Sequence, residues 1–343
     1  MKKIYDYTID ELTEQFLDLG QKKFRAMQVF EWLYLKHANS FEVMSNINKE
    51  LQSKLSDLYV IDFLKLKQKQ VSKDGTVKYL FELSDGHLIE TVLMRMDYGN
   101  SVCVTSQVGC NMACSFCASG LLKKQRNLSA GEMVAQVMFV QQELNQEFER
   151  VSHVVVMGTG EPFDNYEEVT KFIRIINTPK GLAIGARHIT VSTCGLCDKI
   201  EEYAHFGLQT NLAISLHAPN DEKRSQIMPI NKRYPMDQLR ESIKKYIEIT
   251  SRRVTFEYIL LKGVNDSLVD ARQLAHYVSG LNAYVNLIPY NSVGEHGFKQ
   301  SDKATIDQFY SELTRLKVRA TVRKEHGADI DGACGQLRAK HQG

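Results

Sequence analysis

The sequence predicts an α/β protein in which a parallel, barrel-like sheet follows a small helical domain. The first observation is helical spacing near the amino terminus, where Val29, Phe30 and Leu33 of "AMQVFEWLYLKHA" lie three and four residues apart. The second is a pair of β-rich runs on either side of "SDGH". The third is the alternation of short β-branched runs with helical segments after residue 100, which is typical of parallel strands joined by helical crossovers.

These observations divide the chain into three segments. Residues 1–75 are expected to form a helical accessory domain that binds RNA, with the helical pattern running from about residue 8 to residue 70. Residues 76–99 are expected to form a β-hairpin linker, because Asp85-Gly86 between two β-rich runs is a strong hairpin signal. Residues 100–343 are expected to form the larger α/β domain.

The larger domain carries seven runs with strand character: "SVCVTS", "SHVVVMG", "HITVST", "TNLAISLH", "RVTFEYILL", "VNLIPYN" and "RATVRK". A helix is expected to begin at Ser129, because Glu132 three residues later completes a capping box. Polar or unusual residues follow the carboxyl ends of most of the strand runs. In barrel-like α/β folds these ends form the active-site face, so we expect a single site at that mouth.

Composition excludes several classes of protein. A chain of 343 residues that is 43% hydrophobic can bury a full core without disulfide or metal staples. It has no apolar run of membrane-spanning length, and its start, "MKKIYDYTIDELTEQ", lacks the apolar stretch of a signal peptide. We therefore expect a cytoplasmic protein without membrane contact. Seven clustered cysteines favour metal or redox chemistry over a disulfide framework, and a net charge of +2 neither demands nor excludes a nucleic-acid partner.

The stretch "GCNMACSFCASG" places Cys110, Cys114 and Cys117 close together and offers no fourth cysteine nearby. A structural zinc site needs four ligands, and the only other C-x-x-C pair, Cys194 and Cys197, follows a different strand. A four-iron cluster can take three thiolates from a tight loop and leave one iron open for a substrate or cofactor. The sequence therefore favours an iron–sulfur cluster, with zinc as the alternative.

The C-x3-C-x2-C spacing, with Phe116 before the last cysteine, resembles the cluster loop of the radical S-adenosylmethionine (SAM) superfamily. "MGTGEP" resembles a turn that grips the amino group of SAM, although a glycine-rich turn alone is a weak signal. Longer stretches are similar to the ribosomal RNA adenine C2 methyltransferases, the RlmN family: "FRAMQVFEWLY", "GEPFDN", "SLHAPNDEKRSQIMPIN", "RRVTFEYILLKGVND", "VNLIPYN" and "DIDGACGQLRAK". This resemblance covers nearly the whole chain and implies a partial (β/α)6 TIM-like radical SAM barrel.

The resemblance also implies a radical methyl transfer that uses a [4Fe-4S] cluster and two SAM molecules per turnover. One SAM methylates Cys334, and the second is cleaved to a 5'-deoxyadenosyl radical that takes a hydrogen from the S-methyl group. The resulting carbon radical adds to C2 of adenosine and gives a covalent protein–RNA adduct. Cys103 would resolve this adduct through a transient disulfide with Cys334, while Glu90 would act as the proton acceptor. Taken alone, each cysteine also fits a structural role, and Glu90 also fits a solvated carboxylate.

The site residues that the resemblance implies fall into two groups. The cluster ligands are Cys110, Cys114 and Cys117. The SAM contacts are Gly160, Glu161, Ser192, Ser215, Leu216, His217 and Asn291. Considered alone, His217 also fits a core histidine and Asn291 a turn residue. Cys194 and Cys197 receive no role, and we expect them to be reduced thiols in a βα loop.

The implied partners are 23S ribosomal RNA before or during ribosome assembly, methylated at adenosine 2503 of the peptidyl transferase centre, and tRNA, methylated at adenosine 37. An electron donor such as flavodoxin would supply the cluster, and the enzyme is expected to be a monomer. Basic residues could hold phosphates while the adenosine is splayed out, several of them near the proposed mouth. The candidates are Lys123, Lys124, Arg126, Lys232, Arg233, Arg252, Arg253, Arg338 and Lys340, and replacing the first three by Ala is expected to weaken RNA binding.

Two alternatives remain at this point. The first is the related adenosine C8 methyltransferase of the antibiotic-resistance branch. Pro162 in "GEPF" resembles the C2 branch, whereas the C8 branch tends to carry Ala there. The second is a zinc-containing RNA-binding protein without catalysis, which a colourless protein that contains zinc would indicate.

Overall fold

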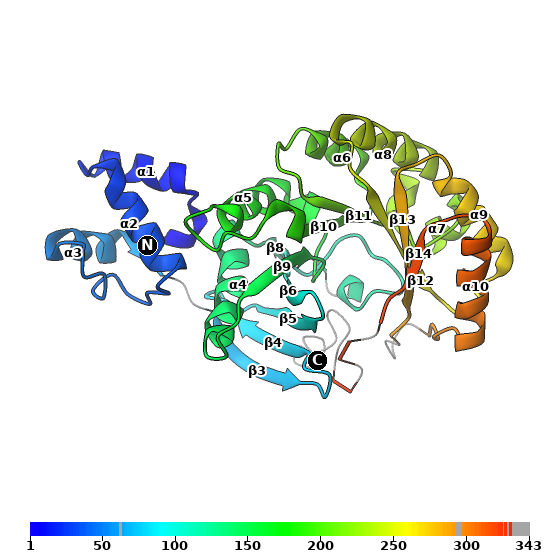
Figure 1. The fold of residues 1–343 in the computed structure, drawn as a ribbon, viewed down its shortest axis with the longest axis horizontal. Helices are drawn as coiled ribbons and strands as arrows, with labels where there is room; N and C mark the ends of the chain where they lie inside the picture. The colour runs from blue at the N-terminus through cyan, green and yellow to red at the C-terminus, as the bar shows by residue number, and fades with distance from the viewer. Residues whose placement is uncertain (62–63, 122, 292–296, 325, 328, 331–343) are drawn as a thin grey trace.

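The computed structural model describes the whole chain except residues 62–63, 122, 292–296, 325, 328 and 331–343. Its amino-terminal part is a helical domain that lies to one side of a large sheet (Figure 1). Thr8 and Glu11 form a capping box at the start of its first helix. The elements are β1 (Lys2–Lys3), η1 (Ile4–Asp6), α1 (Ile9–Asp18), α2 (Lys23–Tyr34), α3 (Lys49–Leu58) and β2 (Tyr59–Val60).

The large sheet has ten strands in the order β14-β13-β12-β11-β10-β9-β6-β5-β4-β3. Its seven parallel strands correspond to the seven runs expected from the sequence: β6 (Gly99–Cys103), β9 (Val151–Val156), β10 (Ile189–Thr193), β11 (Asn211–Ser215), β12 (Val254–Leu260), β13 (Ala283–Pro289) and β14 (Ala320–Val322). Each of these strands pairs in parallel with its neighbour in the order. Because the order ends at β14 on one side, the sheet is curved but open, as in a partial barrel.

Three antiparallel strands extend the sheet beyond β6: β3 (Lys65–Val71), β4 (Val77–Glu82) and β5 (Leu88–Met96). The expected hairpin is present, because β4 and β5 are joined by a turn at Asp85-Gly86 in which Gly86 has a φ of +83°. This hairpin belongs to the sheet of the larger domain, since β5 pairs with β6.

The helical prediction is wrong over residues 65–71, which form β3. This segment, "KLKQKQV", pairs with β4 at the edge of the sheet, where its charged side chains face solvent. Lysines on an edge strand also protect that edge against pairing with other chains. The strand therefore owes its conformation to a partner in the fold and not to an apolar pattern of its own.

The helices of the larger domain lie around the outside of the curved sheet (Figure 1). They are α4 (Ala130–Asn145), α5 (Tyr166–Asn177), α6 (Cys197–Ala204), α7 (Asp221–Ile227), α8 (Met236–Thr250), α9 (Leu268–Val278) and α10 (Lys303–Arg315), with the short helices η2 (Ala118–Leu121), η3 (Pro162–Asn165), η4 (Ala186–His188) and η5 (Pro229–Lys232). The capping box predicted at Ser129 and Glu132 is confirmed, because each side chain accepts the backbone N–H of the other residue.

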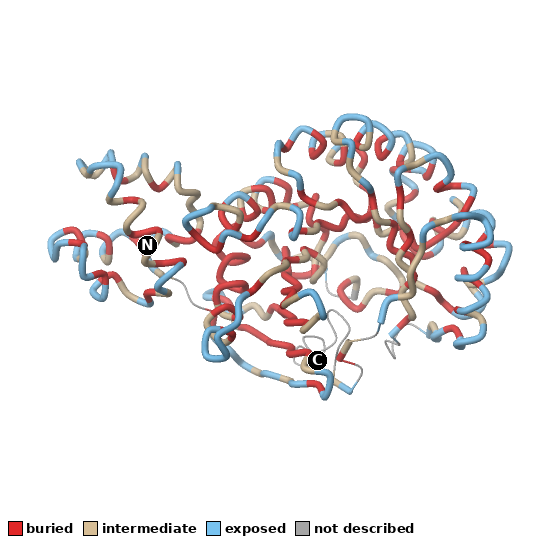
Figure 2. Tube along the Cα trace, viewed as in Figure 1, coloured by how far each residue is buried: buried red, intermediate tan, exposed pale blue. Residues whose placement is uncertain are grey.

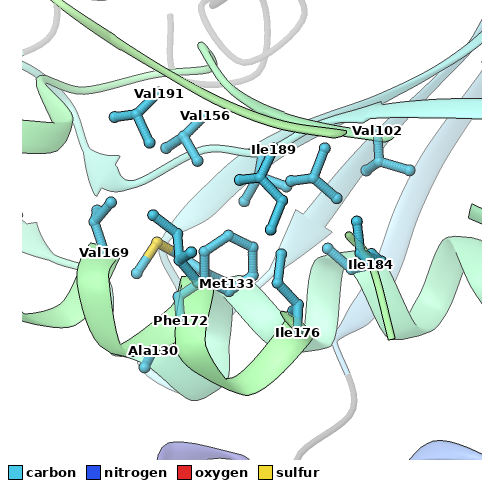
Figure 3. Close-up of a cluster of buried hydrophobic side chains, with 14 of the residues drawn as sticks. Val102, Ala130, Met133, Val156, Val169, Phe172, Ile176, Ile184, Ile189 and Val191 are labelled. Atoms are coloured by element: carbon cyan, nitrogen blue, oxygen red, sulfur yellow. The ribbon is translucent and has the colours of Figure 1, made fainter. Parts of the chain in front are cut away.

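The core lies between these helices and the sheet. Figure 3 shows Met133 of α4 and Phe172 and Ile176 of α5 close to Val156 and Ile189 of the neighbouring strands. All five side chains are fully buried. In Figure 2 the strands are mostly buried, whereas the outward faces of the helices are exposed. Among the described residues, no helix combines the length and apolar character needed to cross a membrane.

Candidate active site

The three motif cysteines lie on a loop that β7 (Gln107–Val108) and β8 (Arg126–Asn127) close as an antiparallel pair. Within the loop, the backbone N–H of Cys117 donates to the carbonyl oxygen of Cys114 at 3.2 Å. The N–H of Ser115 donates to the carbonyl oxygen of Ile227, at the end of α7, at 2.9 Å. All three cysteines are partly exposed. The loop is therefore tied to the barrel wall while its thiols remain accessible from one side.

These thiols line a cavity of about 210 Å³ at the carboxyl ends of the parallel strands, which we name the cluster cavity. Five of the seven residues expected to contact SAM line the same cavity: Gly160, Glu161, Ser192, Ser215 and His217. The fold therefore brings the cysteine loop, which follows β6, together with residues at the carboxyl ends of β9, β10 and β11. Leu216 is fully buried outside this lining, and Asn291 lies in the adjacent cavity described below.

The "GTGE" turn after β9 is packed against the segment that follows β6. A Cβ atom on Gly158 would lie 2.8 Å from the backbone nitrogen of Thr105, and one on Gly160, whose φ is +115°, would lie 2.7 Å from Cβ of Gln107. Both positions therefore require glycine. The backbone N–H of Glu161 donates to Oε1 of Gln107 at 2.9 Å, which fixes the turn at the edge of the cluster cavity.

Glu161 is buried, and both of its carboxylate oxygens accept backbone N–H groups. Oε1 accepts from Phe163 at 3.0 Å, and Oε2 accepts from Cys194 at 2.8 Å. Burial raises the pKa of this carboxyl, although these hydrogen bonds act against the shift. Glu161 therefore holds two loops together at the cavity, in addition to any contact with a ligand.

His217 is held as a neutral ring. Its Nδ1 accepts the backbone N–H of Ile259 at 3.1 Å, and the ring meets Phe116 edge to face, with 5.0 Å between centroids. Burial lowers the pKa of His217 to about 3, and the positive charge of Arg224 acts in the same direction. Since Nδ1 is an acceptor, the proton lies on Nε2, which is the ring atom able to donate to a ligand.

A second cavity, of about 270 Å³, adjoins the cluster cavity, and we name it the central cavity. Both cavities are lined by Phe116, Cys117, Met157, Ile288 and Arg323. Cys103, at the end of β6, also lines the central cavity and packs with Val92 and Met94. Cys103 and the cysteine loop therefore face one continuous lumen.

Glu90 lies on β5, two residues before Val92, and thus on the lumen side of the sheet. It is buried, so the solvated carboxylate considered from the sequence is wrong for this residue. Its Oε2 lies 3.0 Å from Nζ of Lys78 on β4, and the Lys78 side chain is completely buried. This buried ion pair could not be predicted from local sequence patterns, because the two residues meet only once β4 and β5 are paired.

A larger cavity, of about 930 Å³, opens at the amino ends of the parallel strands, and we name it the amino-end cavity. It joins the central cavity, since both are lined by Met94, Val155, Met157, Arg323, Lys324 and His326. Arg252 and Arg253 precede β12 and line this cavity. These two arginines therefore lie at the opposite end of the barrel from the cysteine loop.

Three arginines of the amino-end cavity have neutral partners. Arg252 donates to Oδ1 of Asn211 at 2.6 Å, Arg253 lies over the Tyr284 ring, and Arg319 donates to Oδ1 of Asn282 at 3.2 Å. Within the described part of the chain, none of these three arginines forms an ion pair. The cavity is therefore strongly cationic.

The basic residues after the cysteine loop are different. Nζ of Lys124 lies 2.6 Å from Asp164, and Arg126 pairs with both Asp85 and Glu132 at 2.5 and 2.7 Å. Lys123 is exposed. Two of the three cations expected to bind phosphate are thus already neutralised by carboxylates of the chain. Cys334, Arg338 and Lys340 lie outside the described residues.

Sequence reasoning missed three buried polar residues: Lys78 and Glu257 on the lumen side of the sheet, and Arg224 behind the cysteine loop. Glu257 of β12 lines both the cluster cavity and the amino-end cavity and accepts from Nδ2 of Asn286 at 2.8 Å. Burial raises the pKa of Glu257, against the opposing charge of Arg323. A charged residue within an apolar strand run such as "VTFEYIL" is the signal that could have identified it.

The donor set fits an iron–sulfur cluster. Burial raises the pKa of Cys110 to about 12, and burial together with the Cys117 and Cys110 thiols raises the pKa of Cys114 well above its usual range. Thiols placed so close together become thiolates only with a strongly cationic partner. No group of three or more His, Cys, Asp or Glu in the described ranges converges on a single metal ion. A four-iron cluster needs no such convergence, because each thiolate binds a different iron.

Comparison with known proteins gives the class. Residues 104–275 match the Radical SAM superfamily, and residues 2–61 match the ribosomal RNA large subunit methyltransferase N-terminal domain. The chain is therefore a radical SAM protein, a class that implies a [4Fe-4S] cluster and SAM. Cys110, Cys114 and Cys117 would hold that cluster in the cluster cavity. This class takes the place of the zinc alternative.

The particular family follows from individual relatives. The chain is 57% identical to a probable dual-specificity RNA methyltransferase RlmN of Spiroplasma citri, covering 100% of this chain and 99% of the relative. It is 58% identical to a protein of the same name from Streptococcus equi subsp. zooepidemicus, covering 98% and 95%. A crystal structure of a radical SAM methyltransferase from Sphaerobacter thermophilus superposes with a TM-score of 0.94 at 42% identity, covering 98% and 99%. The chain belongs to the RlmN family.

Proposed function

We propose that this protein is an RNA methyltransferase that methylates C2 of adenosine 2503 in 23S ribosomal RNA and C2 of adenosine 37 in some tRNAs. One observation carries the proposal: the cysteine loop, the expected SAM contacts and Cys103 face one continuous lumen. A chain that only bound RNA would have no need for thiols of two kinds in one cavity. The names of the relatives, RNA methyltransferases of dual specificity, support the same substrate class.

The cofactors define what the chain must hold in place. When bound, the cluster and SAM supply radical chemistry that can activate a methyl group. Cys110, Cys114 and Cys117 would bind the cluster. The backbone of the "GTGE" turn and the Ser192 and Ser215 hydroxyls, whose oxygens lie 3.2 Å apart, would orient SAM. His217 would present its Nε2–H to the same ligand without adding charge.

The proposed chemistry assigns separate tasks to two cysteines. The Cys334 thiolate would first displace the methyl group from a sulfonium and keep it as a thioether. After the activated methyl carbon has bonded to C2, the radical adduct would return one electron to the bound iron–sulfur cluster and lose its C2 proton, which Glu90 would accept. The Cys103 thiolate would then attack the Cys334 sulfur and break the carbon–sulfur bond. The electron pair of that bond would remain on the methylene carbon, which gains a proton to become the methyl group, and a disulfide would remain on the protein.

Lys78 would orient the Glu90 carboxylate, the proposed proton acceptor. Its ammonium lies 3.0 Å from the carboxylate inside a buried region, which fixes the direction in which the Glu90 carboxylate points. Both residues project from strands of the sheet, so the acceptor would be positioned by a rigid scaffold.

The RNA would enter from the amino ends of the strands. Arg252, Arg253 and Arg319 surround that opening with no carboxylate partner among the described residues, and Tyr98 there is 61% exposed. Free cations bind phosphates, and exposed aromatic rings stack on unpaired bases. A flipped adenosine would pass from this opening to the central cavity, where Cys103 lies. We propose that the enzyme acts as a cytoplasmic monomer with an electron donor such as flavodoxin.

The C8 methyltransferase is the second candidate. Pro162 begins η3 and lines the cluster cavity, so the residue that resembles the C2 branch lies next to the proposed SAM site. The two functions give different products. 2-Methyladenosine supports the C2 assignment, and 8-methyladenosine would replace it.

The test uses the full chain, loaded with iron and sulfide under anaerobic conditions and given SAM and a reductant. Fragments of 23S ribosomal RNA and a tRNA serve as substrates, and mass spectrometry locates the methyl group. C103A should accumulate a covalent protein–RNA adduct, whereas C334A should give neither adduct nor product. C197A, which removes a buried thiol away from the lumen lining, is the matched control and should methylate normally. Methylation by C334A would contradict the proposed route.

A further inference from the structure

Arg224 is a buried cation whose hydrogen-bond partners are all neutral. Its side chain on α7 has no exposed surface. Nε donates to the carbonyl oxygen of Leu216 at 3.2 Å, Nη1 to Oδ1 of Asn231 at 2.9 Å, and Nη2 to the carbonyl oxygen of Cys194 at 2.6 Å. In the described part of the chain it forms no ion pair, and Asp221 reaches the network only through Asn231. A buried charge without a counter-charge costs several kcal/mol.

The surroundings of Arg224 show where a counter-charge would lie. One helical turn after Arg224, the carbonyl oxygen of Ile227 accepts the backbone N–H of Ser115 in the cysteine loop. Ile227 and Cys194 belong to the same apolar cluster as Phe116, and Cys114 and Cys117 pack against that cluster. The guanidinium is also electrostatically coupled to Cys114. Arg224 therefore lies behind the loop, on the side away from the cluster cavity.

The cluster implied by the family has the missing sign. A four-iron core bound by three thiolates carries one net negative charge in its oxidised state and a second after one-electron reduction. We propose that Arg224 is the internal counter-charge of this cluster, a positioning residue that raises its reduction potential. This inference rests on the cluster assignment within the proposed function, and it requires nothing of the RNA or of the later methyl chemistry.

Arg224 can raise the reduction potential of the cluster because its buried surroundings are only weakly polarizable. A cation fixed in a buried region favours the more negative state of a neighbouring group, and net charge and burial are among the factors that set cluster potentials. The rigid hydrogen bonds of Arg224 prevent it from turning toward solvent. Its effect should therefore remain nearly constant as salt is added, unlike that of a surface lysine.

The first experiment compares R224Q and R224K with wild type as full-length, cluster-loaded proteins. Each is titrated anaerobically with dithionite at known potentials, and the reduced cluster is followed by electron paramagnetic resonance. At the potential that half-reduces wild type, R224Q should show a tenfold lower ratio of reduced to oxidised cluster, equivalent to about 59 mV for a one-electron couple. R224K should stay close to wild type. K245Q, which removes an exposed cation paired with Glu201, is the matched control and should not shift.

The second experiment remains informative even if R224Q is less stable than wild type. The thermal midpoint of each protein is measured with and without cluster, and the difference reports how much the cluster stabilises the fold. Lost hydrogen bonds affect both forms and cancel, so R224Q should show a smaller difference than wild type and R224K. An R224Q cluster with wild-type potential and an unchanged difference would overturn the role of Arg224 alone. A wild-type chain that binds no cluster would overturn this inference together with the proposed function.

Discussion

The buried pair of Lys78 and Glu90 gives a stability prediction that can be worked out from the structure. The Lys78 side chain has no exposed surface, the Glu90 side chain is 4% exposed, and their charged atoms lie 3.0 Å apart. Replacing Lys78 by Met removes one partner and leaves a carboxylate buried in a region of low dielectric constant. Changes of this kind cost about 3–5 kcal/mol of unfolding free energy. We expect K78M to lose an amount in this range.

The double variant separates the pair from its surroundings. K78M/E90L removes both charges and fills the space with apolar groups, which in other proteins is often neutral or stabilising. We expect it to recover most of the loss, ending within about 1–2 kcal/mol of wild type. The double variant should nevertheless fail to methylate RNA, because the proposed proton acceptor is gone. The double variant would therefore regain stability without regaining activity.

The assay is urea unfolding of the cluster-free chain under reducing conditions, followed by circular dichroism. The coupling energy is the loss in the double variant minus the sum of the losses in the two single variants. A K78M variant that loses less than about 1 kcal/mol would refute the buried-pair argument. So would a double variant whose loss equals the sum of the single losses, because the two charges would then act independently.

Three further predictions follow from the same structure. R252A/R253A should lower RNA affinity and weaken its dependence on salt concentration in filter-binding titrations. K124A should change RNA affinity little, because Asp164 already neutralises that lysine. An unchanged salt dependence for the double variant would contradict the proposed RNA entry. Burial lowers the pKa of His217 to about 3, so below about pH 6.5 the unfolded chain binds a proton that the folded chain does not. The unfolding free energy should therefore fall by up to about 1.4 kcal/mol per pH unit as the pH decreases. In urea titrations at several pH values, H217N should show a weaker fall, and a variant with the wild-type pH dependence would be inconsistent with a neutral buried ring. S129A should cost about 1 kcal/mol in urea unfolding, and no loss would show that the capping box of α4 is unimportant.

Most of the parallel strands could be predicted because they are apolar, largely β-branched runs whose side chains form much of the buried core. Val154 and Val191, for example, are fully buried within such runs. The edge strand over residues 65–71 could not, since its lysines alternate with other polar residues and its pairing partner β4 lies later in the sequence. Local pattern identifies a strand only where the strand carries its own apolar face.

Some residues of the candidate site could be predicted from the sequence, and others could not. Cys110 and Gly160 lie in short motifs whose spacing is itself the signal. Lys78 and Arg224 lie in ordinary-looking segments, and their importance comes from complete burial beside groups contributed by other strands or loops. From the sequence alone, a lysine or arginine with a carboxylate partner also cannot be told from one without such a partner. Only the fold shows that Arg126 is neutralised by two carboxylates and Arg253 by none in the described chain.

The distribution of charge along the lumen explains how two very different ligands could share it. Thiols and the buried Arg224 lie at the carboxyl ends of the strands, and unpaired arginines lie at the amino ends. Between them, the central cavity is lined mainly by apolar side chains such as Val92 and Val155. An anionic RNA would be attracted to the amino end, while the negative charge of a bound cluster would be balanced at the other. In the proposed reaction the target base and the activated methyl group would therefore meet in the apolar middle, where few polar groups compete for a radical.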